Sequence, residues 1–107
     1  MPGRVLIVDD IRPNITLLEA KLTSEYYDVI AAENGHKAID LARQESPDLI
    51  LLDIMMPGLD GFKVCEILKS DPTTAHIPVI MVTALSDMVA VPVFTNPLVL
   101  VPVMVPE

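Results

Sequence analysis

The chain has 107 residues, enough for one domain and too few for two, and 51% of them are hydrophobic, which excludes disorder over most of its length. Fifteen acidic against seven basic side chains give a formal net charge of −8, which argues against a nucleic-acid-binding surface. The single cysteine, Cys65, cannot form an internal disulfide, and no secretory leader precedes the first apolar run, so we expect a protein of the reducing cytoplasm.

The N-terminal part of the chain predicts a strand followed by a helix. An unbroken apolar run at residues 5–8 is typical of a strand that is covered on both faces. Apolar side chains then recur at helical spacing between residues 11 and 22, where Asp10 or Asn14 can cap the helix. Pro13 fits the first turn of this helix, because a first-turn N–H has no partner within the helix.

The same alternation continues through the middle of the chain. Residues 27–32 predict a second strand, and the Asn34–Gly35 turn opens a second helix. Residues 49–52 are the clearest buried strand, Asp60 caps a third helix, and residues 77–82 predict a fourth strand. This alternation indicates an α/β fold, an open parallel sheet with helices on both faces. We expect the first and third strands to be neighbours at a topological switch point, with ligands outside their carboxyl ends.

Acidic and hydroxyl side chains stand at those strand ends. The residues are Asp9 and Asp10 after the first strand, Asp53 after the third, and Thr83 after the fourth, with the backbone N–H of Ala84 beside it. Carboxylates that lie close together repel one another unless one is protonated or a cation lies among them. Such ligands suit Mg²⁺, or Mn²⁺ in its place. The pattern predicts an aspartyl-phosphate site, in which a carboxylate attacks an activated phosphoryl donor.

Each of these residue types also has a purely structural interpretation. A single Asp or Thr after a strand is most often a cap, but acids and a hydroxyl at successive strand ends are together much less expected by chance. His36 and His76 have no partner at metal-ligand spacing, and we expect both to be solvated. Cys65 is expected in the core. Met55 and Met56 are expected to pack or to offer backbone atoms rather than to bind through sulfur.

Three stretches of the chain resemble the receiver domain of bacterial two-component response regulators, which has a flavodoxin-like fold. They are residues 5–10 (VLIVDD), 48–61 (DLILLDIMMPGLDG) and 77–84 (IPVIMVTA). The resemblance covers residues 4 to about 87. Residues 17–23 and 71–78 further resemble the receiver of PleD-type diguanylate cyclases.

The resemblance implies a role for each matching residue. Asp53 matches the phosphoacceptor, and Asp9 and Asp10 match the acidic pair that binds Mg²⁺ together with it. The backbone carbonyl of Met55 matches the third protein ligand, and Thr83 matches the hydroxyl that hydrogen-bonds the phosphoryl group. The implied reaction is transfer from a phosphohistidine of a histidine kinase or phosphotransfer protein to Asp53, followed by slow hydrolysis. The domain is expected to assist only these two steps and not to be an enzyme otherwise.

The C-terminal part of the chain departs from the family. The family has a Lys-Pro pair after its fifth strand, which would fall near residues 105–106, whereas the last lysine here is Lys69. Pro102 stands near the family's aromatic switch position, and nothing predicts an amphipathic fourth or fifth helix. Leu98–Val103 is apolar enough to form a substitute fifth strand, which Pro102 would restrict to the sheet edge. We therefore expect phosphorylation without the usual coupling to an output face.

Residues 88–107 are a different kind of sequence from the receiver core expected at residues 1–87. No ionisable side chain occurs from Met88 to Pro106, and this segment is rich in proline and valine. Its spaced prolines would break a membrane-spanning helix, so we expect no membrane span. A reading-frame change after Met88, a shortened or engineered chain and a degenerate receiver all stay open as its origin.

Two alternative functions come from other classes. An inert receiver would bind protein partners without chemistry. A haloacid-dehalogenase-type phosphatase also uses an aspartyl nucleophile and Mg²⁺, but it needs an Asp-x-Asp pattern after its first strand. Asp9 and Asp10 are adjacent here and Asp53 stands alone, so we reject the phosphatase.

The missing helices also bear on the surface of the domain. Without them Ile80 and Val82 would lose burial, and residues 88–107 would pack irregularly. An uncovered apolar face favours association, so we expect a homodimer through this face.

Overall fold

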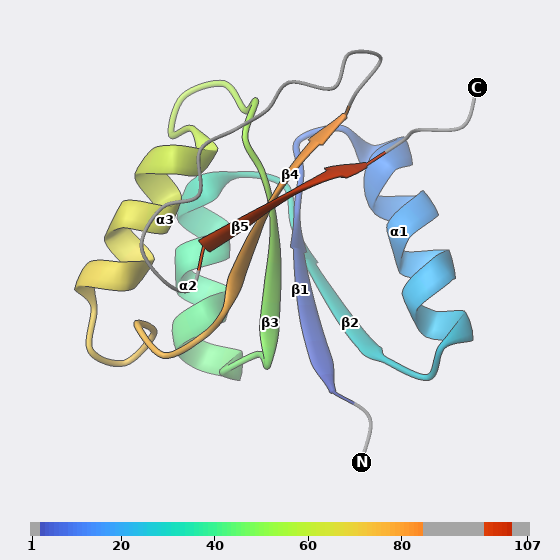
Figure 1. The fold of residues 1–107 in the computed structure, drawn as a ribbon, viewed down its shortest axis with the longest axis horizontal. Coiled ribbons are helices and arrows are strands. Elements are labelled where there is room, and N and C mark those ends of the chain that lie inside the picture. Colours follow the sequence, from blue (N-terminus) through green and yellow to red (C-terminus); the bar gives the residue numbers. More distant parts are fainter. Residues whose placement is uncertain (1–2, 85–97, 104–107) are drawn as a thin grey trace.

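The computed structural model of the chain describes residues 3–84 and 98–103, which form one sheet flanked by helices (Figure 1). The sheet has five strands among these residues, and each pair of neighbouring strands is parallel. The predicted open parallel sheet with helices on both faces is confirmed. In chain order the elements are β1 (Arg4–Val8), α1 (Arg12–Ser24), β2 (Asp28–Ala32), α2 (Gly35–Glu45), β3 (Leu49–Asp53), α3 (Gly61–Ser70), β4 (Val79–Ala84) and β5 (Leu98–Val103).

The strand order is β2-β1-β3-β4-β5, so β1 and β3 lie side by side in the middle of the sheet. Val5 pairs with Leu49, and the register continues to Val8 opposite Leu52. The chain winds outward from β1 to β2 and then returns past β1 to β3, so the winding direction reverses between β1 and β3. This is the predicted topological switch point, where ligands of open α/β sheets bind.

Helices cover both faces of the sheet (Figure 1). On one face α1 packs on β1 and β2, where Val5, Ile7 and Ile15 form a buried cluster. On the other face α2 and α3 cover the larger core, to which β1, β3 and β4 contribute Leu6, Val8, Ile50, Leu52, Val79 and Met81. Residues 5–8 are buried on both faces, which explains their unbroken apolar run.

The second and third helices begin with side-chain caps. Asn34 accepts a hydrogen bond from the N–H of Lys37, and Asp60 accepts one from the N–H of Lys63, both at 2.8 Å. Each bond satisfies a backbone donor that has no partner within the helix. The predicted Asp60 cap and the predicted helix opening at Asn34 are confirmed.

The first helix begins differently from its predicted start. Its N-cap residue is Ile11, with no side-chain cap, so the prediction that Asp10 or Asn14 caps it is wrong. The Ile11 N–H is instead held by the carboxylate of Asp9 at 2.9 Å. Pro13 lies in the first turn as predicted and has no N–H to satisfy there.

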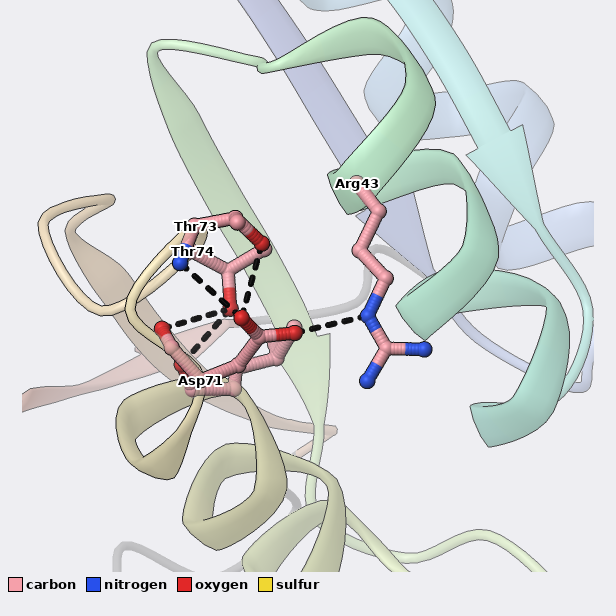
Figure 2. Close-up of polar contacts among 5 residues, drawn as sticks. Arg43, Asp71, Thr73 and Thr74 are labelled. Atoms are coloured by element: carbon pink, nitrogen blue, oxygen red, sulfur yellow. Dashed lines mark hydrogen bonds and ion pairs between the residues drawn. The ribbon is translucent and has the colours of Figure 1, made fainter.

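A polar cluster ties the loop before β4 to α2 (Figure 2). The Asp71 carboxylate accepts hydrogen bonds from the backbone N–H of Thr73 at 2.9 Å, from Nε of Arg43 at 2.7 Å and from the Thr73 hydroxyl at 2.8 Å. These bonds, the Thr73 N–H above all, lower the pKa of Asp71 to about 2. The buried Thr74 hydroxyl donates to the carbonyl of Leu68 at 2.7 Å, which fastens the loop to the end of α3.

Because of this loop, β4 begins two residues later than the predicted strand at 77–82. Ile77 donates its N–H to the carbonyl of Thr74 within the loop. Pro78 has no N–H, although its carbonyl accepts a hydrogen bond from Ile50 of β3. Regular pairing therefore begins at Val79.

The sequence prediction of a substitute fifth strand at Leu98–Val103 is confirmed, because β5 pairs with β4 along its whole length. It is an edge strand, where Pro102 opposite Thr83 is tolerated. The expectation of irregular packing over residues 88–107 is wrong for this stretch, and the rest of that segment lies outside the described residues. Val82 is only 8% exposed, so the prediction that it loses burial is also wrong. β5 pairs with β4 along the edge that was expected to be uncovered. Ile80 is half-buried.

Several side chains lie where the sequence placed them. His36 and His76 are exposed, and Cys65 is buried in the core. Met56 is buried, whereas Met55 is 74% exposed. Within the described residues, no helix combines the length and the apolar character needed to span a membrane.

Candidate functional site

The site lies where β1 and β3 end beside each other. Val8 is the last residue of β1 and pairs with Leu52, so Asp9 follows β1 at the level of Asp53, the last residue of β3. Backbone hydrogen bonds between the strands continue past these acids. The Asp9 N–H donates to the carbonyl of Ala32 in β2, and the Ile54 N–H, directly after Asp53, donates to the carbonyl of Val82 in β4, both at 3.1 Å. Four strands therefore fix the backbone at this edge.

Three carboxyl groups converge here, as the sequence predicts. Asp9, Asp10 and Asp53 each offer a carboxylate oxygen, and these three oxygens lie within 4.8 Å of one another. Asp9 is 6% exposed and Asp53 is 8% exposed, whereas Asp10 is exposed to solvent. The cluster is thus reached from the side of Asp10.

Backbone donors orient the two buried acids. One oxygen of Asp9 accepts the N–H of Ile11 at 2.9 Å, and one oxygen of Asp53 accepts the N–H of Met55 at 3.1 Å. In both cases the donor lies two residues further along the chain, which is the pattern of an Asx turn. One oxygen of each carboxylate is held in this way, so each side chain has a fixed direction.

The environment favours the neutral form of Asp53. Burial above all, together with the negative charges of Asp9 and Asp10, raises its pKa to about 6. The hydrogen bond from Met55 acts in the opposite direction, because it stabilises the carboxylate. Repulsion among the three carboxylates is unfavourable, and a bound cation would reduce it.

The donor set suits a hard divalent cation. Mg²⁺ prefers oxygen ligands, binds through one or two carboxylates and keeps waters or phosphate oxygens in its other positions. Asp9, Asp10 and Asp53 offer carboxylate oxygens close enough together to share one ion, and the exposed position of Asp10 leaves a way in. The residues present therefore fit this metal.

The remaining predicted residues lie near the cluster along the backbone. Val82 pairs with Asp53, and Thr83 and Ala84 are the next two residues, at the end of β4. The side chain of Thr83 lies outside what the structure describes. Met55 lies two residues beyond Asp53, where its N–H contacts the Asp53 carboxylate. The roles of the Thr83 hydroxyl, the Ala84 N–H and the Met55 carbonyl stay predictions.

One residue of the site was missed by the sequence reasoning. Gly61, the first residue of α3, lies directly against the backbone of Asp53 and donates its N–H to the carbonyl of Ile54 at 3.2 Å. The signal in the sequence was a glycine directly after the capping Asp60, where most helices tolerate a side chain. Only the packing of α3 against the end of β3 explains it.

Comparison with known proteins agrees with this geometry. The family model described as "Response regulator receiver domain" matches residues 5–95. The response regulator PleD of Caulobacter vibrioides is 60% identical over 85 residues, which cover 79% of this chain and 19% of PleD. Protein PilH of Pseudomonas aeruginosa is 49% identical over 81 residues, which cover 76% of this chain and 67% of PilH. The chain thus spans about a fifth of the length of PleD.

The fold is also similar to solved structures. The N-terminal domain of a response regulator receiver protein from Methanoculleus marisnigri aligns with a TM-score of 0.76 and 37% identity, over 78% of this chain and 68% of that one. A response regulator from Chloroflexus aurantiacus aligns with a TM-score of 0.77 and 33% identity, over 82% of this chain and 72% of that one.

Proposed function

Because this chain belongs to the family of response regulator receiver domains, we propose that it is a phosphoacceptor module, in which Asp53 accepts a phosphoryl group with the help of Mg²⁺. The donor is the phosphohistidine of a histidine kinase or a phosphotransfer protein. The observation that carries the proposal is the convergence of three carboxylates within 4.8 Å at the switch point of the sheet.

We assign the nucleophile to Asp53, the residue that matches the phosphoacceptor of the family. It ends the central strand β3, and one of its oxygens is held by the N–H of Met55, which leaves the other oxygen to attack phosphorus. In the reaction the new bond joins this oxygen to phosphorus, the bond from phosphorus to the histidine nitrogen breaks, and that nitrogen takes up a proton from solvent.

Asp9 and Asp10 would hold the cation beside the nucleophile, together with Asp53 and the backbone carbonyl of Met55. Bound Mg²⁺ neutralises the charge that gathers on the phosphoryl oxygens. The buried Asp9 is already oriented by the Ile11 N–H, so little reorganisation is required when the ion binds.

We assign the other phosphoryl contacts to β4. The hydroxyl of Thr83 and the N–H of Ala84 would donate to phosphoryl oxygens, and their place at the end of β4, next to the end of β3, supports this role. The chain has no lysine after Lys69, so an ammonium partner for the phosphoryl group is missing. We therefore propose that this module is phosphorylated but couples weakly to an output surface, and that it assists only its own phosphorylation and dephosphorylation.

Further assignments follow from composition and from the sequence pattern. We propose a receiver core at residues 1–87 and an apolar segment at 88–107 that replaces the family's fourth helix, fifth strand and fifth helix. A cytoplasmic location fits the single buried cysteine. The charge of −8 disfavours nucleic acid, and a homodimer through the receiver face is the proposed assembly.

The alternative is an inert receiver that acts only by binding proteins. A small-molecule phosphodonor, acetyl phosphate, separates the two with intact mass as the readout. We expect one phosphate on the wild type with Mg²⁺, none on Asp53→Asn and none in EDTA. The exposed Asp40 of α2 provides a matched control, and Asp40→Asn should be phosphorylated like the wild type. No adduct on the wild type under any of these conditions would favour the inert receiver.

A further inference from the structure

Gly61 occupies a place at the start of α3 that no side chain can share. A Cβ atom built on it would lie 2.3 Å from the carbonyl oxygen of Asp53, 2.8 Å from Cα of Ile54 and 3.0 Å from the carbonyl carbon of Asp53. All three of these atoms belong to the backbone, so no change of rotamer relieves the contact. Either the start of α3 or the peptide between Asp53 and Ile54 would have to move.

That peptide belongs to the turn that orients the Asp53 carboxylate. The Met55 N–H, one residue beyond Ile54, holds an oxygen of Asp53 at 3.1 Å. The Gly61 N–H donates to the Ile54 carbonyl at 3.2 Å and closes the loop between β3 and α3 on itself. A shift of the backbone at Gly61 therefore changes the direction of the Asp53 side chain.

We propose that Gly61 is a positioning residue for the phosphoacceptor: its missing side chain lets α3 close against the Asp53–Ile54 peptide and so fixes the reactive oxygen of Asp53. The inference rests on the proposed role of Asp53. It adds to that role a residue that contacts neither metal nor phosphoryl group and acts only through the backbone.

The fold provides a matched control in Gly35. It is likewise the first residue of a helix, follows a capping residue, Asn34, and is buried. A Cβ on Gly35 would meet a methyl group of Val64 at 2.6 Å and, at 3.0 Å, a methyl group and the carbonyl oxygen of Leu59, and none of these atoms belongs to the Asp53–Met55 turn. Gly35→Ala should thus disturb helix packing as Gly61→Ala does, but it should leave the direction of Asp53 unchanged.

The test compares wild type, Gly61→Ala and Gly35→Ala by three readouts. The first is the rate constant of phosphorylation at saturating acetyl phosphate and Mg²⁺, the second is Mg²⁺ affinity by calorimetry, and the third is the amide resonance of Met55. We expect Gly61→Ala to lose on the order of 10- to 100-fold in rate constant, as misplacements of about an ångström do. Its Mg²⁺ affinity should fall and its Met55 resonance should shift, while Gly35→Ala stays close to the wild type in all three.

The outcomes separate this inference from the proposed function. If the wild type itself is not phosphorylated, the proposed function fails, and Mg²⁺ affinity and the Met55 resonance still decide the role of Gly61. A folded Gly61→Ala that matches Gly35→Ala in every readout would overturn the inference. If Gly61→Ala does not fold in buffer, all three proteins are compared in trimethylamine N-oxide, which favours compact states. Failure to fold even there, with Gly35→Ala folded, would also overturn it, because the inference requires the chain to absorb the methyl group by a shift at Asp53.

Discussion

The pKa of Asp53 is raised by burial and by charge repulsion, and it is lowered by a single backbone hydrogen bond. An Asp in an unfolded chain has a pKa of about 3.9, whereas burial and the neighbouring Asp9 and Asp10 raise the pKa of Asp53 to about 6. The folded state therefore binds the Asp53 proton more tightly than the unfolded state does. With respect to this group, the free energy of unfolding is highest at low pH and falls as the pH rises from about 4 to beyond 6.

The direction of this pH dependence gives a prediction for Asp53→Asn in metal-free buffer. The amide cannot ionise, so at pH 8 the variant should be more stable than the wild type by on the order of 1–3 kcal/mol, and near pH 4 the difference should vanish. Urea denaturation at the two pH values measures it. The exposed Asp10 serves as control, since Asp10→Asn should give a smaller gain at pH 8. An Asp53→Asn protein that is stabilised equally at both pH values would contradict this reading of the site.

At the scale of elements, the position of β4 depends on the loop before it. Asp71 gathers three hydrogen bonds, two from Thr73 and one from Arg43 of α2, and the buried hydroxyl of Thr74 fastens the same loop to α3. β4 in turn ends with Thr83 and Ala84, directly after Val82, which pairs with Asp53. The polar cluster in Figure 2 is thus a structural connection between α2, α3 and the strand that completes the proposed phosphoryl contacts.

We predict that Asp71→Ala lowers the free energy of unfolding, because three donors lose their acceptor. The pKa of Asp71 is lowered to about 2, so its contribution is complete above the unfolded value of about 4 and is lost as the pH falls toward 2. The stability deficit of the variant should therefore shrink over that interval. Thermal melts at a series of pH values measure it, with Arg43→Ala as a control that removes only one donor. A deficit that stays constant down to the lowest pH would contradict the prediction.

At the scale of the whole molecule, the helices are distributed unevenly over the sheet. α1 packs on β1 and β2, and among the described residues no other helix lies on its face (Figure 1). Leu49 and Leu51 of β3, and Ile80 opposite Leu51 on β4, are only half-buried there. These side chains form an apolar strip beside α1, and such strips favour association.

We predict that the protein self-associates through this strip. Sedimentation equilibrium should show a dimer that dissociates on dilution, and Ile80→Lys should be monomeric with an unchanged circular dichroism spectrum, because a charge at the centre of the strip cannot be buried without a partner. A lysine at the exposed Glu19 on α1 is the control, and Glu19→Lys should still dimerise. A wild type that stays monomeric at every concentration would refute the prediction.

The sequence by itself determined the order of elements and the positions of the acids. The unbroken apolar runs at residues 5–8 and 49–52 predict strands, and both runs form strands of the sheet, although Leu49 and Leu51 are only half-buried. The acidic residues of the site could likewise be identified from the sequence once parallel strands were expected, because the carboxyl ends of such strands lie at the same edge of the sheet.

The tertiary structure alone decided which acids are buried and what each one contacts. Asp9 was expected to act at the metal, and Asp10 both at the metal and as a helix cap, but it is the Asp9 carboxylate that accepts the Ile11 N–H, and Asp10 is exposed. The raised pKa of Asp53 arises from burial and from the charges of Asp9 and Asp10, which are distant in the chain, and the close approach of Gly61 arises from the packing of α3 against the end of β3. Such contacts leave no periodic signal in the sequence, because their energies depend on distances that only the packed molecule sets.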